Sequence, residues 1–330
     1  MKTQHTIGEI SSNVLPFRRD LHLYILSAIM LFFILCLVTG SALADNVNLC
    51  TLTSKAALKA CKHEAEDAYW IAIGNCNNFS TVAERAECKK AAKEDLRSDR
   101  EDCRDQFEAR QDVCQMLGEE PYNPVIDPEQ FLGKDKIIAN PNPYFPLIPG
   151  TTLVYKGGNE TITVTVTNET KTILGVTCIV VTDVVKVDSE VVEDTVDWYA
   201  QDIDGNVWYF GEIAKGFKDG DLVSLEGSWK AGVDSAKPGI IMKAMPTVGD
   251  VYRQEFALGD AEDMGEVLSL TGSAQVPAVS CSNNCLIIRD FSPLEPGVNE
   301  QKFYASGIGF ILGVNLETGE RVELTEITTK

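Results

Sequence analysis

The chain has 330 residues, of which 44% are hydrophobic, and its 49 acidic and 29 basic side chains give a formal net charge of −20. So acidic a chain repels phosphate backbones, and no basic stripe with interleaved aromatic residues occurs, so we expect no nucleic-acid partner. No histidine follows His63. Residues 64–330 therefore cannot supply a Ser-His-Asp or Cys-His mechanism or a histidine-based metal centre.

Residues 1–44 have the features of an export signal. Two arginines precede an apolar run over residues 23–38, and residues 42–44 (Ala-Leu-Ala) have the small-x-small form of a cleavage site. We expect a mature protein that begins at Asp45, has no membrane span and reaches the periplasm, the cell surface or the medium, where disulfides form. An uncleaved anchor is the alternative, although the run is shorter than the roughly 20 residues of a typical span.

Six cysteines in residues 45–120 are arranged symmetrically about a point near residue 82. The outer, middle and inner pairs, all centred there, are Cys50 with Cys114, Cys61 with Cys103 and Cys76 with Cys88. This symmetry predicts two antiparallel helices with nested disulfides, because only the nested pairing puts every pair at one level of a hairpin. Metal storage or haem attachment is the alternative, but the segment has no C-x-x-C pair.

Helix signals agree with the hairpin. A T-x-x-E capping box at Thr81 and Glu84 predicts the start of the second helix, and Gly118 predicts its end. The first helix should span about 51–76. Between the cysteines, facing positions pair at least one alanine each time, which lets the helices approach to the Cα separation of roughly 5.5–6 Å that disulfides require.

Seven of the thirteen prolines lie in residues 121–149, too many for a helix or a central strand. This segment is predicted to be an extended linker, docked on the next domain through Phe131, Tyr144 and Phe145.

Residues 150–330 show strand patterns almost throughout. Alternating or β-branched runs predict about eleven strands, over 161–167, 172–187, 195–199, 207–210, 222–229, 251–256, 267–270, 285–289, 301–304, 309–314 and 320–328. Asp204-Gly205 and Thr318-Gly319 are typical of hairpin turns. The predicted fold class is therefore α+β multidomain: a disulfide-stapled helical hairpin followed by an antiparallel all-β barrel, half-barrel or sandwich.

Several long phrases of the β domain resemble an uncharacterised family of secreted bacterial proteins. They are PLIPGTTLVYKG (147–158), DWYAQDIDGNVWYFGE (197–212), GSWKAGVDSAKPGIIM (227–242), GDVYRQEF (249–256) and KFYASGIGF (302–310). The resemblance covers essentially the whole β domain and implies an exported bacterial protein. It supplies no activity. The first phrase also loosely resembles the opening strand of half-barrel lipid carriers of the bacterial envelope.

An aromatic cluster is the first candidate site. It consists of Trp198, Tyr199, Trp208, Tyr209 and Phe210, on two strands joined by a DIDGN turn. Strand alternation places neighbours on opposite faces, so one set should be core and the other could line a ligand cavity. Packing alone is the alternative explanation for the whole cluster.

Acidic residues form a second candidate. Asp202, Asp204 and Asn206 have the alternating spacing of calcium ligands, but a full loop needs further oxygens and a bidentate glutamate that this segment lacks. A polar turn is the simpler interpretation. Asp260, Glu262 and Asp263 form another acidic group, and a glycosidase would need two such carboxylates held about 5–10 Å apart.

The remaining cysteines favour structural roles. Cys281 and Cys285, with three residues between them, are predicted to form a disulfide across a β-turn, although an exposed strained bridge of this kind could be redox-active. Cys178 is then left unpaired in the most apolar strand, where it should behave as a small buried hydrophobic residue.

We expect from these features an exported, non-enzymatic binding protein without a cofactor. Its β domain would hold a small apolar or amphipathic ligand, and the hairpin would act as a rigid spacer or docking arm. A structural or surface-interaction protein that binds a protein partner through the hairpin is the first alternative, and a carboxylate-dependent hydrolase is the second.

Overall fold

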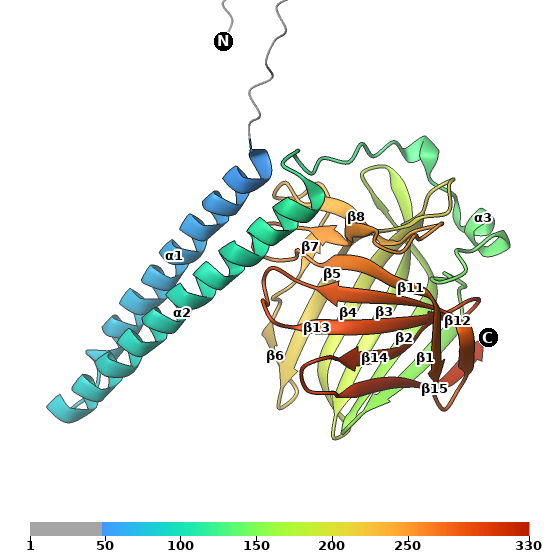
Figure 1. Cartoon of the computed structure of the whole chain (residues 1–330). Coiled ribbons are helices and arrows are strands. Elements are labelled where there is room, and N and C mark those ends of the chain that lie inside the picture. The colour runs from blue at the N-terminus through green and yellow to red at the C-terminus, as the bar shows by residue number, and fades with distance from the viewer. Residues whose placement is uncertain (1–47, 330) are drawn as a thin grey trace, which may run out of the picture. The chain divides into compact units, whose positions relative to one another are not determined.

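A computed structural model describes residues 48–329 (Figure 1). Two helices are followed by a large antiparallel sheet that is nearly closed into a barrel, which confirms the predicted fold class. The predicted export signal lies outside the described residues. No helix within residues 48–329 combines the length and the apolar character that crossing a membrane would require.

The hairpin consists of α1 (Leu49–Cys76) and α2 (Val82–Leu117). Thr81 accepts a hydrogen bond from the Glu84 backbone N–H and donates its own N–H to the Glu84 carboxylate, so the capping box is complete. Gly118 ends α2 with a φ of 89°, a left-handed conformation that glycine adopts without strain. At the same end of the hairpin, the carbonyl and carboxylate of Glu119 accept the first N–H groups of α1.

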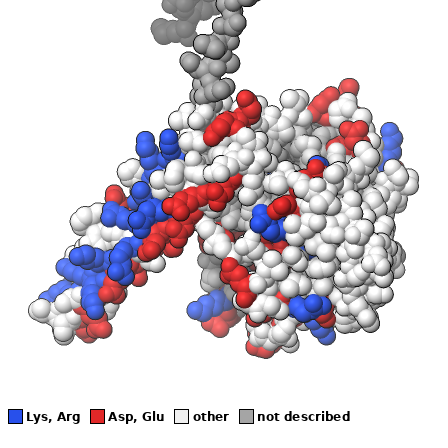
Figure 2. Space-filling model, viewed as in Figure 1, with Lys and Arg blue, Asp and Glu red and all other residues white. Residues whose placement is uncertain are grey.

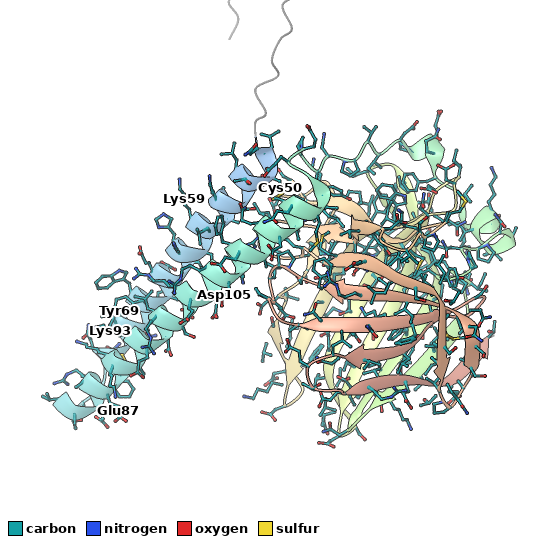
Figure 3. The ribbon with its side chains drawn as sticks, in the orientation of Figure 1. Cys50, Lys59, Tyr69, Glu87, Lys93 and Asp105 are labelled. Atoms are coloured by element: carbon teal, nitrogen blue, oxygen red, sulfur yellow. A yellow bond between two sulfur atoms is a disulfide. The ribbon has the colours of Figure 1, made fainter. Side chains whose placement is uncertain are left out.

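Three disulfides join the helices along their length. Cys50–Cys114, Cys61–Cys103 and Cys76–Cys88 have Cα separations of 5.6, 5.8 and 5.5 Å. Figure 3 places Cys50 at one end of the hairpin and Glu87 near the other. Several of the buried side chains between the bridges are small, as at Ala57, Ala65 and Ala92. Since so little apolar surface is buried, the disulfides are the main constraint on this element.

The barrel is built from fifteen strands. They are β1 (Thr151–Gly157), β2 (Glu160–Ile173), β3 (Val176–Val187), β4 (Glu190–Gln201), β5 (Val207–Lys218), β6 (Asp221–Ser224), β7 (Trp229–Lys230), β8 (Lys237–Met242), β9 (Val251–Arg253), β10 (Glu255–Phe256), β11 (Met264–Gln275), β12 (Ser280–Phe291), β13 (Asn299–Ala305), β14 (Gly309–Asn315) and β15 (Arg321–Thr329).

All strand pairs are antiparallel. Thirteen strands follow the order β10-β8-β5-β4-β3-β2-β1-β15-β14-β13-β12-β11-β9, and β6 and β7 each pair with β5 outside it. The β1–β15 pairing joins the two halves of the domain. The two terminal strands of this order, β9 and β10, are separated by one residue in the chain. The sheet therefore curves until its two edges are brought close together.

Some predicted strand boundaries were wrong. The β-branched run over 172–187 is interrupted by a turn at Leu174 and Gly175, whose φ angles are 50° and 81°. The runs over 222–229 and 251–256 each divide into two short strands, and neither β1 nor β8 was among the expected strands. Residue composition did not reveal the first turn, because apolar and β-branched residues lie on both sides of it.

The linker follows the barrel surface. It includes a short 3-10 turn, η1 (Pro128–Gln130), and one short helix, α3 (Lys134–Ala139). Phe131 packs edge-on against Trp208 and Phe210, at centroid distances of 6.1 and 5.5 Å. Asn142, which is 2% exposed, donates to two barrel carbonyls and accepts from the backbone of Tyr144 and Phe145. The linker is thus held against the barrel by both apolar and polar contacts.

Strand alternation divides the apolar residues between two layers. On β3, Ile179 and Val181 belong to the cluster inside the barrel, whereas Cys178 and Val180 belong to a second cluster on the opposite face. Cys178 is free and fully buried, and burial raises the pKa of its thiol to about 12. This cysteine is therefore a packing residue with little thiolate at neutral pH.

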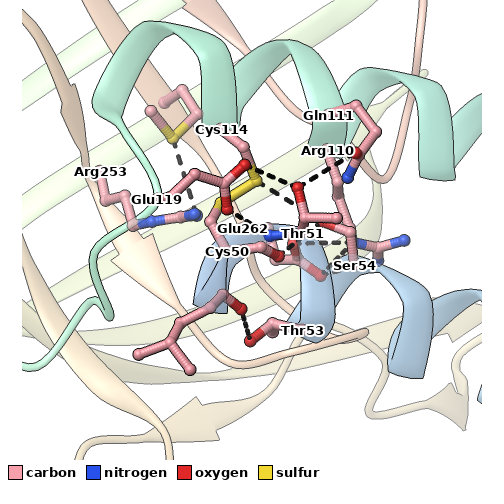
Figure 4. Close-up of a disulfide and its surroundings, with 12 residues drawn as sticks. Cys50, Thr51, Thr53, Ser54, Arg110, Gln111, Cys114, Glu119, Arg253 and Glu262 are labelled. Carbon is pink, nitrogen blue, oxygen red and sulfur yellow. Dashed lines mark hydrogen bonds and ion pairs between the residues drawn. A yellow bond between two sulfur atoms is a disulfide. The ribbon is translucent and has the colours of Figure 1, made fainter. Parts of the chain in front are cut away.

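One buried ion pair links the hairpin to the barrel. The Arg110 guanidinium on α2 donates from Nε at 3.0 Å and from Nη2 at 2.7 Å to the Glu262 carboxylate (Figure 4). Glu262 also accepts the Gly259 backbone N–H at 2.9 Å. Most other charges of the hairpin are exposed, and Figure 2 shows basic and acidic side chains side by side along it.

Candidate ligand-binding site

A cavity of about 370 Å³ lies among residues on the inner face of the barrel. Its volume falls in the range of about 300–1,000 Å³ that is usual for small-molecule sites. The lining is mainly aliphatic and aromatic, and includes Leu147, Leu153, Ile162, Val164, Val166, Val181, Tyr155, Tyr199, Tyr304 and Phe310. Four ionisable side chains, Asp183, Asp197, Glu300 and Lys302, complete the wall.

The strand registers explain why these groups meet. Along β3, Val181 and Asp183 point to the same face, and along β4 so do Asp197 and Tyr199. Val181 is the direct partner of Asp197 across the two strands, so Asp183 lies diagonal to Asp197. Lys302 comes from β13, which belongs to the other half of the domain. The site therefore depends on the barrel bringing distant strands together.

Lys302 is already paired. Its ammonium lies 2.5 Å from the Asp290 carboxylate and 3.7 Å from the Glu300 carboxylate. Neither Asp183 nor Asp197 makes an ion pair with another residue of the range 48–329. The charges around the cavity consequently have an acidic excess.

The two aspartates differ in hydrogen bonding. Asp197 is 6% exposed and accepts the Tyr209 hydroxyl at 2.5 Å. Asp183 is only partly buried, yet its Oδ1 atom is buried without a hydrogen-bond partner. A buried oxygen of this kind is costly unless it is protonated or receives a partner.

Burial changes the proton affinity of the carboxyl groups in and beside this cavity. It raises the pKa of Asp183 to about 7, and the neighbouring charge of Asp197 adds to the effect. Burial also raises the pKa of Asp197 to about 6. On β5, the carboxyl of Glu212 lies opposite Asp197, and burial together with the Asp197 charge raises its pKa to about 8. These carboxyls can therefore exchange protons or bind a cation near neutral pH.

Of the five aromatic residues that the sequence singles out, Tyr199 alone lines this cavity. Tyr209 stacks on Tyr199 at a centroid distance of 4.6 Å, and Phe145 of the linker packs against Tyr199 at 5.0 Å. Trp198, Tyr209 and Phe210 all belong to the second apolar cluster, and Tyr199 packs against both that cluster and the one inside the barrel. Trp208 packs against the second cluster too. One of the five predicted residues therefore lines the cavity, and the other four pack in or against the second apolar cluster.

The acidic turn has a structural role. The Asp202 carboxylate accepts the backbone N–H and the side-chain amide of Asn206 and the indole N–H of Trp208, each at 2.8 Å. Its oxygens therefore hold the turn and the neighbouring indole. Within residues 48–329, no group of three or more His, Cys, Asp or Glu side chains has an arrangement that could hold a metal ion.

The second acidic group does not assemble into one site. Glu262 is committed to Arg110, whereas Asp263 lies nearer Ser292 and Lys302, and burial raises its pKa. In the same domain, Cys281 and Cys285 form a disulfide with a Cα separation of 5.6 Å.

Sequence reasoning did not select Asp183, Asp197 or Lys302. The sequence feature that could have identified this site is Asp183, which is the one charged residue within the apolar run ILGVTCIVVTDVV. A charge on the inner face of a buried strand indicates either a paired group or a site.

The chain matches no protein-family model, no curated protein and no solved structure. The assignment of a function to the cavity therefore depends on its geometry and chemistry.

Proposed function

We propose that the protein is an exported binding protein whose barrel holds a small apolar or amphipathic ligand, with the hairpin as a rigid arm. The cavity of about 370 Å³ with its aliphatic and aromatic lining carries this proposal. The diameter of a barrel grows with its number of strands, and larger barrels can enclose ligand cavities. The unfilled apolar volume inside this one favours ligand binding over a purely structural role. The disulfides and the family resemblance support export.

Native mass spectrometry of the protein purified gently from its own envelope fraction tests the proposal. We expect a mass excess in the native spectrum that disappears when the protein is denatured. A cavity-filling variant, Val164→Trp, should lose the excess, because Val164 lines the cavity.

Val191→Trp is the matched control. Val191 is on β4, and it is 37% exposed and does not line the cavity. An excess that survives in Val164→Trp, or that is lost equally in both variants, would contradict ligand binding in the barrel.

The hairpin supports a second candidate function, capture of a protein partner. Close to its turn, Trp70, Ile71 and Val82 are 66%, 58% and 75% exposed. Exposed large apolar side chains of this kind are candidates for contact with a partner. Crosslinking from this end of the hairpin in the native envelope would test the idea. A specific crosslinked species that is lost in Trp70→Ser is the expected result.

A further inference from the structure

We infer that the ligand of the barrel carries a cationic head group, such as an ammonium, on an apolar body. The inference rests on the proposed function and specifies its ligand class. It is based on the uncompensated carboxylates and the aromatic groups that line the same cavity.

The charges of Asp183 and Asp197 are not balanced within the cavity. Carboxylates lie near these two groups on several strands: Glu160 on β2, Glu193 on β4 and Glu212 on β5. The nearby cation is Lys302, which is engaged by Asp290 and Glu300. A second cation supplied by a ligand would balance Asp183 and Asp197, and it would give the unpartnered Oδ1 of Asp183 a donor.

Aromatic side chains also line the cavity. Tyr199 shares the cavity with the two aspartates, and Phe145, Tyr155 and Phe310 line it as well. The faces of aromatic rings attract cations, most strongly where water is excluded. Carboxylates combined with aromatic rings therefore suit a nitrogen cation. The aliphatic residues Leu153, Ile162 and Val164 provide apolar surface for the body of the ligand.

The same features disfavour an anionic amphiphile. A carboxylate or phosphate head would face Asp183 and Asp197, and the Lys302 ammonium is already ion-paired with Asp290. Like charges at close range repel one another, whereas a neutral hydroxyl head could donate a hydrogen bond to the buried oxygen but would not balance the charge of the two carboxylates.

Isothermal titration of the full mature protein with three eight-carbon probes tests the inference: octylamine, octanol and octanoate. At pH 8 we expect octylamine to bind about tenfold or more tightly than octanol, with octanoate weakest, as one charge-assisted contact implies. When the pH is lowered from 8 to 5, the affinity for octylamine should fall, because the aspartates become protonated. Octanol should not change, because neither its own charge nor its apolar contacts depend on pH.

Two variants locate the effect. Asp183→Asn and Asp197→Asn should each lower the affinity for octylamine about tenfold, and each should leave the affinity for octanol within about twofold of that of the unaltered protein. Asp221→Asn is the matched control, since Asp221 is an exposed residue at the start of β6. The comparison of probes and the pH series use the unaltered protein, so the test does not depend on the folding of either variant.

The possible results separate the two proposals. Octanol binding as tightly as octylamine would overturn the cationic ligand and leave the apolar cavity supported. Preference for octanoate would also overturn it. If no probe binds at any pH, both the inference and the proposed binding function fail. Octylamine binding that the Val164→Trp substitution does not affect would place the cation outside the cavity and overturn the inference.

Discussion

An arginine cannot release its proton to escape burial, so Arg110 requires a carboxylate where the hairpin meets the barrel. Its side chain is 5% exposed and that of Glu262 is 2% exposed. We predict that Glu262→Gln lowers the free energy of unfolding by about 3–5 kcal/mol, because it leaves the guanidinium buried without a counter-charge. The glutamine oxygen can still accept the Gly259 N–H, which isolates the loss of charge. Urea denaturation followed by tryptophan fluorescence measures the change.

The hairpin provides a matched control for this pair. Arg100 and Glu66 lie 2.6 Å apart, but both are 47% exposed. Glu66→Gln should therefore change the free energy of unfolding by no more than about 1 kcal/mol. Equal effects of the two substitutions would show that burial of the Arg110 pair is not what makes it important.

The inner carboxyls predict an unusual dependence of stability on pH. The folded-state pKa values of Asp183 and Glu212, about 7 and about 8, exceed their unfolded values near 4, so the native state binds more protons. Their contribution is fully present below the unfolded pKa and is lost as pH rises through the folded pKa. The free energy of unfolding should therefore fall between pH 5 and pH 8 in ligand-free protein.

Urea midpoints at several pH values measure this slope. Asp183→Asn should flatten it, because one of the protons involved is removed, whereas Asp221→Asn at the surface should leave it unchanged. A stability that rises with pH in the unaltered protein would contradict the assignment of raised pKa values to these carboxyls.

In the hairpin, the stabilisation that each nested disulfide contributes depends on the other two. Once Cys61–Cys103 has formed, Cys50–Cys114 closes only the short segments between these two bridges, so its contribution is smaller than its sequence separation of 64 suggests. Replacing both cysteines of any single bridge by serine should cost roughly 2–4 kcal/mol. Removing all three should abolish the helices, because α1 and α2 bury few apolar side chains.

Thermal melts followed by far-ultraviolet circular dichroism test this prediction. Cys281→Ser with Cys285→Ser is the control, since that bridge lies in the barrel and should not alter helix content. A triple-bridge variant that retains its helical signal would show that packing alone can hold the hairpin.

The elements also show which parts of the fold could be predicted. The symmetry of the cysteines and the capping signals predict both helices closely, because helix periodicity and disulfide reach are local constraints. The break between β2 and β3 was missed, because one of its two left-handed residues is Leu174, and leucine is not a residue type that predicts a turn. The cavity could not be predicted. Asp183 and Lys302 meet only through barrel closure, which no local pattern specifies.

The hairpin and the barrel contact each other, but they do not share an apolar core. None of the three apolar clusters of the barrel contains a residue of α1 or α2, and none of the residues that line the inner cavity comes from the hairpin. The coupling consists of contacts such as Arg110 to Glu262 and the Gln106 amide to the Leu294 carbonyl, at 3.0 Å. Folding and binding of the barrel should therefore depend little on the hairpin.

Deletion of the hairpin, with residues 45–118 removed, tests this separation. We predict a folded barrel that binds octylamine within about twofold of the full protein, since the cavity wall is intact and Glu262 becomes accessible to water. Crosslinking of any hairpin-dependent partner should disappear in the same variant. Loss of ligand binding with the barrel still folded would mean that the hairpin shapes the cavity, and it would contradict the role of a separate arm. Loss of the partner alone would support a two-part protein in which the barrel selects the ligand and the hairpin provides the docking.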